Sequence, residues 1–196
     1  MKKELYQTII FLLTDNIKND ELQQLYVKMK DTGSIFFLCN NSYDLNYFIN
    51  NSSLDFLEKI NSIGFNYINT IILPRKVKDS DGFDNVQYLL WFVKDHKKMF
   101  FLKDKIREKH IWKDVEWGKR KKNYNPNGKD PGNVWLPTND DGRGKITEHL
   151  ILEDIEILER CVISTSKVGD NILIYFNSEL PKSKVLNNRK TVLFLF

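Results

Sequence analysis

Short apolar runs separated by amphipathic segments constrain the possible folds of this chain more than any other sequence feature. Runs rich in β-branched and aromatic residues recur at six places along its 196 residues: Leu5–Leu13, Ser34–Cys39, Tyr67–Leu73, Asn85–Val93, Asn171–Phe176 and Thr191–Phe196. Near-continuous apolar runs of this length are typical of strands buried on both faces. Strands that alternate with helical segments predict a sheet covered by helices. We therefore expect an α/β fold, a three-layer sandwich with a mixed, mainly parallel sheet.

The segments between these runs carry apolar residues at helical spacing. We expect helices in four places: Lys18–Lys30, Tyr43–Ile63, Glu148–Ser166 and a short helix around Val185. Asp15 lies where a side chain would cap the first of these helices. The triplet Asp31-Thr32-Gly33 predicts a turn after it, with Gly33 as the residue that ends the helix.

The sequence changes character between Lys94 and Lys145. Charge density rises, Gly and Pro become frequent, and Trp112, Trp117 and Trp135 interrupt polar sequence. Because neither the helical nor the strand period is visible, we expect a loop-rich insert outside the sheet. We expect Trp135 to be a packing anchor more than a surface on which a base stacks. We interpret residues 1–196 as a single domain, with residues 94–145 as an insert within it.

Composition excludes several classes of protein. A hydrophobic fraction of 41% with 29% charged residues is typical of a globular chain and not of a disordered one. No apolar run reaches the roughly 20 residues of a membrane span. Cys39 and Cys161 lie in apolar runs, as buried free thiols in a reducing compartment do. We expect a soluble, intracellular (cytoplasmic) protein with no membrane attachment and, since no Cys/His spacing is typical of zinc, no metal.

A cluster of basic residues indicates a possible partner. The densest charge run of the chain has four residues: Lys119, Arg120, Lys121 and Lys122. Trp117 and Tyr124 flank it, and a basic run with aromatic neighbours is typical of a surface that contacts nucleic-acid phosphates. A solvated surface loop is the alternative interpretation. Arg75 and Lys76 would line the same groove, or would belong to a polar loop between strands.

Five motifs in a characteristic order carry a resemblance to one family. They are Met29-Lys30-Asp31-Thr32-Gly33-Ser34-Ile35, Gly64-Phe65, Leu90-Trp91-Phe92-Val93-Lys94, Lys129-Asp130-Pro131-Gly132-Asn133-Val134-Trp135, and a helix led by His149 that ends in Ser166-Lys167-Val168-Gly169-Asp170. With these motifs the chain resembles the β-class amino-DNA methyltransferases, which methylate adenine N6 or cytosine N4 and include subunits of restriction-modification systems. The resemblance implies a methyltransferase-like Rossmann fold, with the catalytic strand first and the S-adenosylmethionine half last. It also implies target recognition by the insert.

The chain departs from this family where the chemistry is expected. The family's Asp-Pro-Pro-Tyr motif corresponds to Thr14-Asp15-Asn16-Ile17, so Asp15 stands at a degenerate catalytic position. The glycine-rich cofactor loop corresponds to Ile174-Tyr175-Phe176-Asn177-Ser178-Glu179. The acid that would hold the cofactor's ribose falls near Leu195 or Phe196. These departures predict a pseudoenzyme with no catalytic residue and no cofactor.

Together, the resemblance and the departures predict a catalytically inactive DNA-methyltransferase-like subunit. It would bind DNA, and it would form a homodimer or pair with an active methyltransferase subunit. Helix faces near Leu22 and Phe48 are the expected contact surface between subunits. Two alternatives stay open: an active enzyme with a divergent site, which would bind S-adenosylmethionine and use Asp15, and a structural interaction module without a nucleic-acid role.

Overall fold

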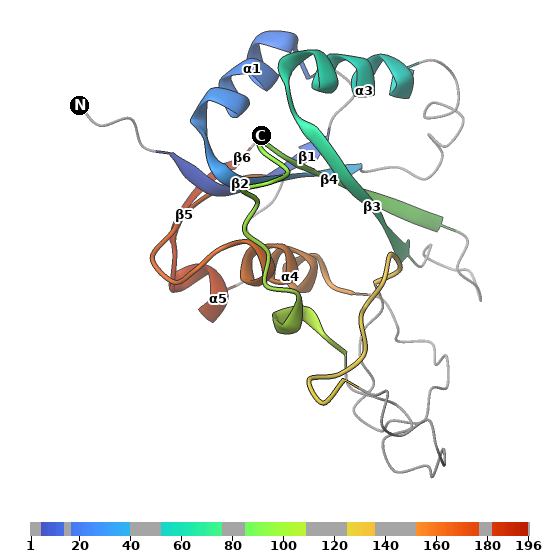
Figure 1. Cartoon of the computed structure of the whole chain (residues 1–196), viewed down its shortest axis with the longest axis vertical. Helices are drawn as coiled ribbons and strands as arrows, with labels where there is room; N and C mark the ends of the chain where they lie inside the picture. Colours follow the sequence, from blue (N-terminus) through green and yellow to red (C-terminus); the bar gives the residue numbers. More distant parts are fainter. Residues whose placement is uncertain are drawn as a thin grey trace.

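The protein is described by a computed structural model that covers residues 5–13, 17–39, 52–75, 85–108, 125–135, 152–176 and 182–195. One sheet lies between two layers of helices (Figure 1). Its strands are β1 (Tyr6–Leu13), β2 (Met29–Cys39), β3 (Asn66–Arg75), β4 (Asn85–Val93), β5 (Asn171–Phe176) and β6 (Lys190–Leu195). The helices are α1 (Asn19–Lys28), α3 (Ser52–Ile63), α4 (Asp154–Thr165) and α5 (Lys184–Asn187), with a 3-10 turn, η1 (Lys103–Ile106). The predicted three-layer sandwich is confirmed.

The strands follow the order β3-β4-β2-β1-β5-β6 across the sheet. β2, β1, β5 and β6 are parallel, whereas β4 is antiparallel to both β2 and β3. All six predicted strands therefore belong to one mixed, mainly parallel sheet, as expected. One consequence is that β1, β2, β3, β5 and β6 all end at the same edge, which we call the carboxyl edge. The opposite edge, where these strands begin, is called the amino edge.

Successive side chains of the central strands enter two different cores. Phe11 and Phe37 are buried on the face covered by α1 and α3, whereas Ile10 and Phe36 are buried on the face covered by α4 (Figure 1). A strand alternates its side chains between the two faces, so an apolar residue at every position is needed when both faces are covered. This double burial explains why the runs in β1 and β2 are continuous and not alternating.

The helix face that we expected to contact a partner is covered by the protein itself. Leu22 is completely buried in the core between α1 and the sheet, so the expectation of a contact surface at Leu22 is wrong. The apolar stripe of α1 is used to cover the sheet, because an uncovered sheet face would leave Phe37 and its neighbours in water. Phe48 lies outside the described residues.

The predicted turn at Asp31-Thr32-Gly33 is wrong, because these residues belong to β2, which begins at Met29. The register explains the turn-like sequence: Tyr6 pairs with Met29 and Thr8 pairs with Ser34, so β2 carries extra residues opposite Gln7. A Cβ at Gly33 would lie 2.6 Å from Met29 Cγ and 3.1 Å from the carbonyl oxygen of Gln7. Gly33 is therefore required for close approach of two strands and does not end a helix.

Helix boundaries also differ from those predicted. α1 starts after Lys18, whose N–H donates to the Glu21 carboxylate at 2.9 Å, so Asp15 is not its cap. α4 starts at Asp154 and not at Glu148, because the N–H of Glu153 donates to the Glu156 carboxylate at 2.8 Å and ends the extended segment. α3 and α4 have 12 residues each, and the described part of the chain contains no helix that could cross a membrane.

The described parts of the insert lie against α4 and the β3 edge (Figure 1). The N–H of Leu102, just before η1, donates to the Ser164 carbonyl oxygen of α4 at 2.6 Å. At β3, Ile72 donates to Asn133 at 2.7 Å and accepts from Trp135 at 3.0 Å through backbone groups. None of the six strands of the sheet comes from the described insert, which meets β3 here through one isolated parallel bridge. Trp135 is 4% exposed, which confirms it as a packing anchor.

Candidate functional site

The carboxyl edge is where open α/β sheets bind their ligands. In this chain the described side chains near that edge form an aromatic row across three strands. Ring centroids of Phe11 and Tyr175 lie 5.0 Å apart, and those of Tyr175 and Phe194 lie 4.9 Å apart with nearly parallel planes. Burial raises the pKa of Tyr175, and the neighbouring Tyr6 and Glu21 add to the shift. Phe194 is the exposed end of this row and Phe11 its buried end, and the Tyr175 hydroxyl stays uncharged at neutral pH.

The described strand ends at this edge carry no polar group that would hold a nucleoside. The strands β5 and β6 end in Ile174-Tyr175-Phe176 and Leu193-Phe194-Leu195, which contain neither glycine nor a carboxylate. A ribose needs a carboxylate for its hydroxyls, and a close backbone approach needs glycine. Cys39, at the end of β2, is no substitute as a nucleophile, because burial raises its pKa to about 12 and keeps the thiol protonated.

Most of the predicted site residues lie outside the described part of the chain: Asp15, Lys76, Lys119, Arg120, Lys121 and Lys122. Arg75 is the last residue of β3 and pairs with Asn85 of β4, which places its backbone at the carboxyl edge. The grouping of Arg75 with the other predicted residues therefore stays a prediction. Across the described ranges, no three His, Cys, Asp or Glu side chains lie close enough to hold a metal ion.

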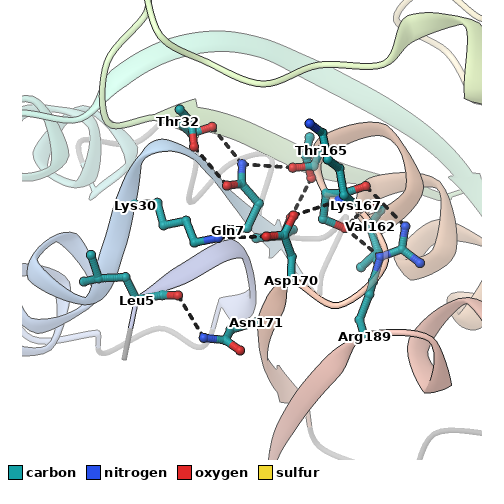
Figure 2. Close-up of polar contacts among 12 residues, drawn as sticks. Leu5, Gln7, Lys30, Thr32, Val162, Thr165, Lys167, Asp170, Asn171 and Arg189 are labelled. Atoms are coloured by element: carbon teal, nitrogen blue, oxygen red, sulfur yellow. Dashed lines mark hydrogen bonds and ion pairs between the residues drawn. The ribbon is translucent and has the colours of Figure 1, made fainter. Parts of the chain in front are cut away.

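A buried polar network crosses the amino edge, and the sequence patterns did not predict it (Figure 2). The Gln7 amide nitrogen donates to the carbonyl oxygens of Thr32 at 2.9 Å and Thr165 at 3.1 Å, and Thr32 Oγ1 donates back to Gln7 at 2.9 Å. The hydroxyls of Thr8 and Thr165 lie 2.8 Å apart. The network joins β1, β2 and the end of α4. Its sequence signal was two adjacent polar residues, Gln7 and Thr8, inside an apolar strand.

Asp170 forms a second polar cluster beside this network, at the start of β5. Its carboxylate accepts from Lys30 Nζ at 2.7 Å and from the N–H of Lys167 at 2.8 Å, while Arg189 Nε donates to Ser166 Oγ at 2.7 Å nearby (Figure 2). Burial alone would raise the pKa of Asp170, but these hydrogen bonds and the two lysine charges outweigh it, so the pKa lies below its ordinary value. Because the network lies opposite the carboxyl edge, we assign it a structural role.

Replacing Asp170 with asparagine should make stability less dependent on acid pH. The carboxyl pKa is lower in the folded chain than its ordinary value of 3.8, so its contribution is present above that pH and is lost as the pH falls through the folded pKa. We expect the free energy of unfolding of the parent to exceed that of Asp170→Asn by about 1 kcal/mol at neutral pH. This difference should vanish in acid. Urea unfolding of both proteins at several pH values measures this, and a pH-independent difference would contradict it.

The insert is attached to α4 by a group of three residues, Glu108, Trp135 and Arg160, which we call the clamp. Arg160 Nη1 lies 3.7 Å from Glu108 Oε1, and its guanidinium carbon lies 5.7 Å from the Trp135 ring centroid. Burial raises the pKa of Glu108, against the opposing charges of Arg160 and Lys129, and burial lowers the pKa of Arg160. The pair is a half-buried contact between opposite charges of the insert and the sheet domain.

Several other charges on the described insert are paired. Lys103 contacts Asp130, Arg107 contacts Asp104, and Lys98 lies 3.1 Å from Asp95. Hydrogen bonds from these partners lower the pKa values of the three aspartates. Most of the described basic residues in this region therefore have an acidic partner within the chain.

Comparisons with known proteins agree with this architecture. A family model described as DNA methylase matches residues 13–177. No curated protein sequence matches the chain at a significant level. Among solved structures, the chain is similar to M1.HpyAVI in complex with SAM, at 15% identity and a TM-score of 0.53, over 97% of this chain and 82% of that one. It is also similar to TTHA0409 from Thermus thermophilus, described as a DNA modification methylase, at 14% identity and a TM-score of 0.51, over 99% and 82%.

The structural likenesses, at such low identity, support the fold alone. The family match covers β2, β3, β4 and β5 together with the described insert, which is most of the chain. The order of the motifs in the sequence and the mixed sheet with its antiparallel β4 agree with it. This chain therefore belongs to the N6/N4 DNA methylase family.

Proposed function

We propose that this family member binds DNA and does not itself transfer methyl groups. The observation that supports this most directly is the aromatic row at the carboxyl ends of β1, β5 and β6. Tyr175 and Phe194 stack on each other there, and hydrocarbon side chains stand at the strand ends. The described residues therefore do not fit S-adenosylmethionine, whose ribose needs a carboxylate and whose approach needs glycine. At the degenerate catalytic position, Asp15 lacks the prolines and tyrosine that would hold a base.

We propose the insert as the DNA-binding surface. Residues 94–145 contain fifteen lysines and arginines and eight aspartates and glutamates, whereas the whole chain has a net charge of only +4. The positive charge is thus concentrated in one segment, and the rest of the chain is slightly acidic. Concentrated positive charge attracts the phosphate backbone regardless of sequence. Within it we assign phosphate contacts to Lys119, Arg120, Lys121 and Lys122, with Arg75 and Lys76 beside them.

We further propose that the chain acts as part of an assembly, either a homodimer or a complex with an active methyltransferase subunit. The reason is chemical: a subunit without a catalytic motif contributes to DNA modification only by positioning DNA or a partner. Because Leu22 is buried against the sheet, it is not part of the contact surface, and the face near Phe48 stays a candidate. Sedimentation of the purified chain, alone and with DNA, tests the homodimer.

The second candidate is an active methyltransferase with a divergent site. It is favoured by one observation, that M1.HpyAVI, a protein of similar fold, has been solved with SAM. The two candidates differ in one measurable property, the affinity of the isolated chain for S-adenosylmethionine.

Titration calorimetry with S-adenosylmethionine distinguishes these candidates. We expect no binding heat from the purified chain and no methyl transfer to duplex DNA, because the ends of β5 and β6 offer no partner for the ribose. M1.HpyAVI, measured under the same conditions, is the positive control. A saturable micromolar isotherm, or methyl incorporation into DNA that disappears in Asp15→Ala, would overturn the proposal and establish the active enzyme.

A further inference from the structure

We infer that the amino edge of the sheet is a second contact surface for the phosphate backbone of DNA. The inference rests on the proposed DNA-binding function and adds to it a surface opposite the edge where open α/β sheets bind their ligands. Four described segments form this surface, 28–31, 94–98, 167–170 and 189–190, which we call the basic edge.

The topology of the sheet brings the four segments together. β2, β5 and β6 begin at the amino edge and the antiparallel β4 ends there, in the order β4-β2-β1-β5-β6. Lys30 Nζ of β2 donates to the Asp170 carboxylate at 2.7 Å, and the N–H of Lys190 donates to the Asp170 carbonyl oxygen at 3.0 Å (Figure 2). On the other side of Lys30, the carboxylate of Asp31 lies 3.4 Å from Lys94 Nζ. Residues that are far apart in the sequence therefore form one continuous surface.

The basic edge carries the net positive charge of the described chain. Its four segments contain eight lysines and arginines and three aspartates, whereas all other described residues contain ten lysines and arginines and eleven acids. The C-termini of α1 and α4 also lie at this edge, and a helix C-terminus favours cations within its last turn. Only Lys28 belongs to such a turn, so helix ends do not account for this concentration of charge.

Three lysines of the basic edge supply charge that is not neutralised locally. Lys97, Lys167 and Lys190 are exposed, and none of them forms an ion pair with an acid of the described residues. Lys167 Nζ lies 5.0 Å from the centroid of the Phe100 ring, a contact that holds the side chain without removing its charge. These three ammonium groups are therefore available to a negatively charged ligand.

The length of the basic edge fits an extended polyanion. Neighbouring strands lie about 4.8 Å apart, so the row from β4 to β6 is about 19 Å long. One DNA strand has a phosphate roughly every 3.4 Å along the helix axis, so a duplex lying along the row would present about five or six phosphates of one strand. A single phosphate ion would be too small to reach from β4 to β6. The DNA backbone is the ligand that would use the whole edge.

The double variant Lys97→Gln/Lys167→Gln tests the inference, because glutamine keeps most of the side-chain stem and removes the charge. We expect weaker binding to a fluorescein-labelled random-sequence duplex, with a salt slope lower by about 1.8, since each lost phosphate contact contributes about 0.9. The loss should be the same for all sequences, because phosphate contacts carry no sequence information. Fluorescence anisotropy at several salt concentrations measures both quantities.

Lys18→Gln/Lys59→Gln is the matched control. Both lysines are exposed and lie outside the basic edge, one just before α1 and the other on α3, and the change in net charge is the same. We expect this variant to keep the salt slope of the parent. Equal losses of slope in the two double variants would show that total charge and not the edge determines binding, and would overturn the inference.

Lysine acetylation of the unaltered chain locates the contact directly. Acetic anhydride modifies exposed lysines, and mass spectrometry compares each lysine with and without bound duplex at low salt. DNA should protect Lys97, Lys167 and Lys190, while Lys18 and Lys59 should stay as reactive as in the free protein. This measurement decides the inference even if the double variant does not fold.

The outcomes separate this inference from the proposed function. A parent that binds DNA, with no protection at Lys97, Lys167 and Lys190 and no change of slope in Lys97→Gln/Lys167→Gln, would overturn the basic edge while leaving DNA binding established. A parent that binds no duplex would overturn the proposed function and the inference with it.

Discussion

Replacing Phe37 with alanine is expected to lower the free energy of unfolding by about 3–5 kcal/mol, the cost typical of a fully buried phenylalanine. Phe37 is completely buried on the α1/α3 face of β2, one of the central strands of the sheet. Its ring meets those of Phe11, Phe56 and Phe92 with centroid distances of 6.0, 5.3 and 5.9 Å. The variant loses these ring contacts and leaves a cavity between the sheet and α3. Urea unfolding followed by circular dichroism measures the change.

Phe194→Ala is the control for this measurement. Phe194 is also an aromatic residue on a strand of the sheet, but it is 47% exposed and stacks mainly on Tyr175. We expect a loss of about 1 kcal/mol, the scale of one aromatic pair. Equal losses for Phe37→Ala and Phe194→Ala would contradict the positions of these side chains, and with them the assignment of β2 to the centre of the sheet.

The largest expected effect on function comes from replacing Lys119, Arg120, Lys121 and Lys122 together with alanine. If all four side chains contact phosphates, the salt slope of DNA binding should fall by roughly 3 to 4, since each contact contributes about 0.9. Binding should weaken for all sequences alike, because phosphate contacts carry no sequence information. Exposed charge changes cost little stability, so the unfolding midpoint should stay close to that of the parent. Fluorescence anisotropy at several salt concentrations measures the slope.

A second quadruple variant separates local contact from total charge. Lys59, Lys182, Lys184 and Lys190 are exposed lysines outside the insert, and their replacement with alanine changes the net charge by the same amount. We expect this control variant to retain most of the parent's salt slope of DNA binding. Equal slopes for the parent and the first variant would show that the basic run is only a solvated loop. The interpretation as a structural module without a nucleic-acid role would then be favoured.

The strands of the sheet could be predicted from sequence because the signal for them is local. Continuous β-branched and aromatic runs such as Asn85–Val93 are typical of strands buried on both faces, and all six were found in the sheet. Trp135 was likewise predicted to be a packing anchor, because a large apolar ring in polar sequence is most stable when buried. Family membership followed from the order of the motifs along the chain, which is itself a property of the sequence.

The predicted start of β2 was wrong because glycine serves two structural purposes. Gly33 in an Asp-Thr-Gly triplet predicts the end of a helix, but here it allows β2 to pass within contact distance of Gln7. The two uses of glycine are distinguished by the distance between β1 and β2, and the sequence of the triplet contains no information about that distance. The prediction of a contact surface at Leu22 was wrong for a related reason. The apolar face of an amphipathic helix looks the same in sequence whether it covers a sheet or a partner. Only the position of the sheet decides between them.

Of the candidate site, the sequence determined the chemistry and the tertiary structure decided the location. The loss of glycine and carboxylate near Tyr175, and the basic run from Lys119 to Lys122, are properties of the residues themselves. The alignment of Phe11, Tyr175 and Phe194 in one row depends on the parallel register of β1, β5 and β6. The clamp between Glu108 and Arg160 has the same origin, because their charges interact only after α4 packs against the insert, and Coulomb energy depends on distance in space and not along the chain.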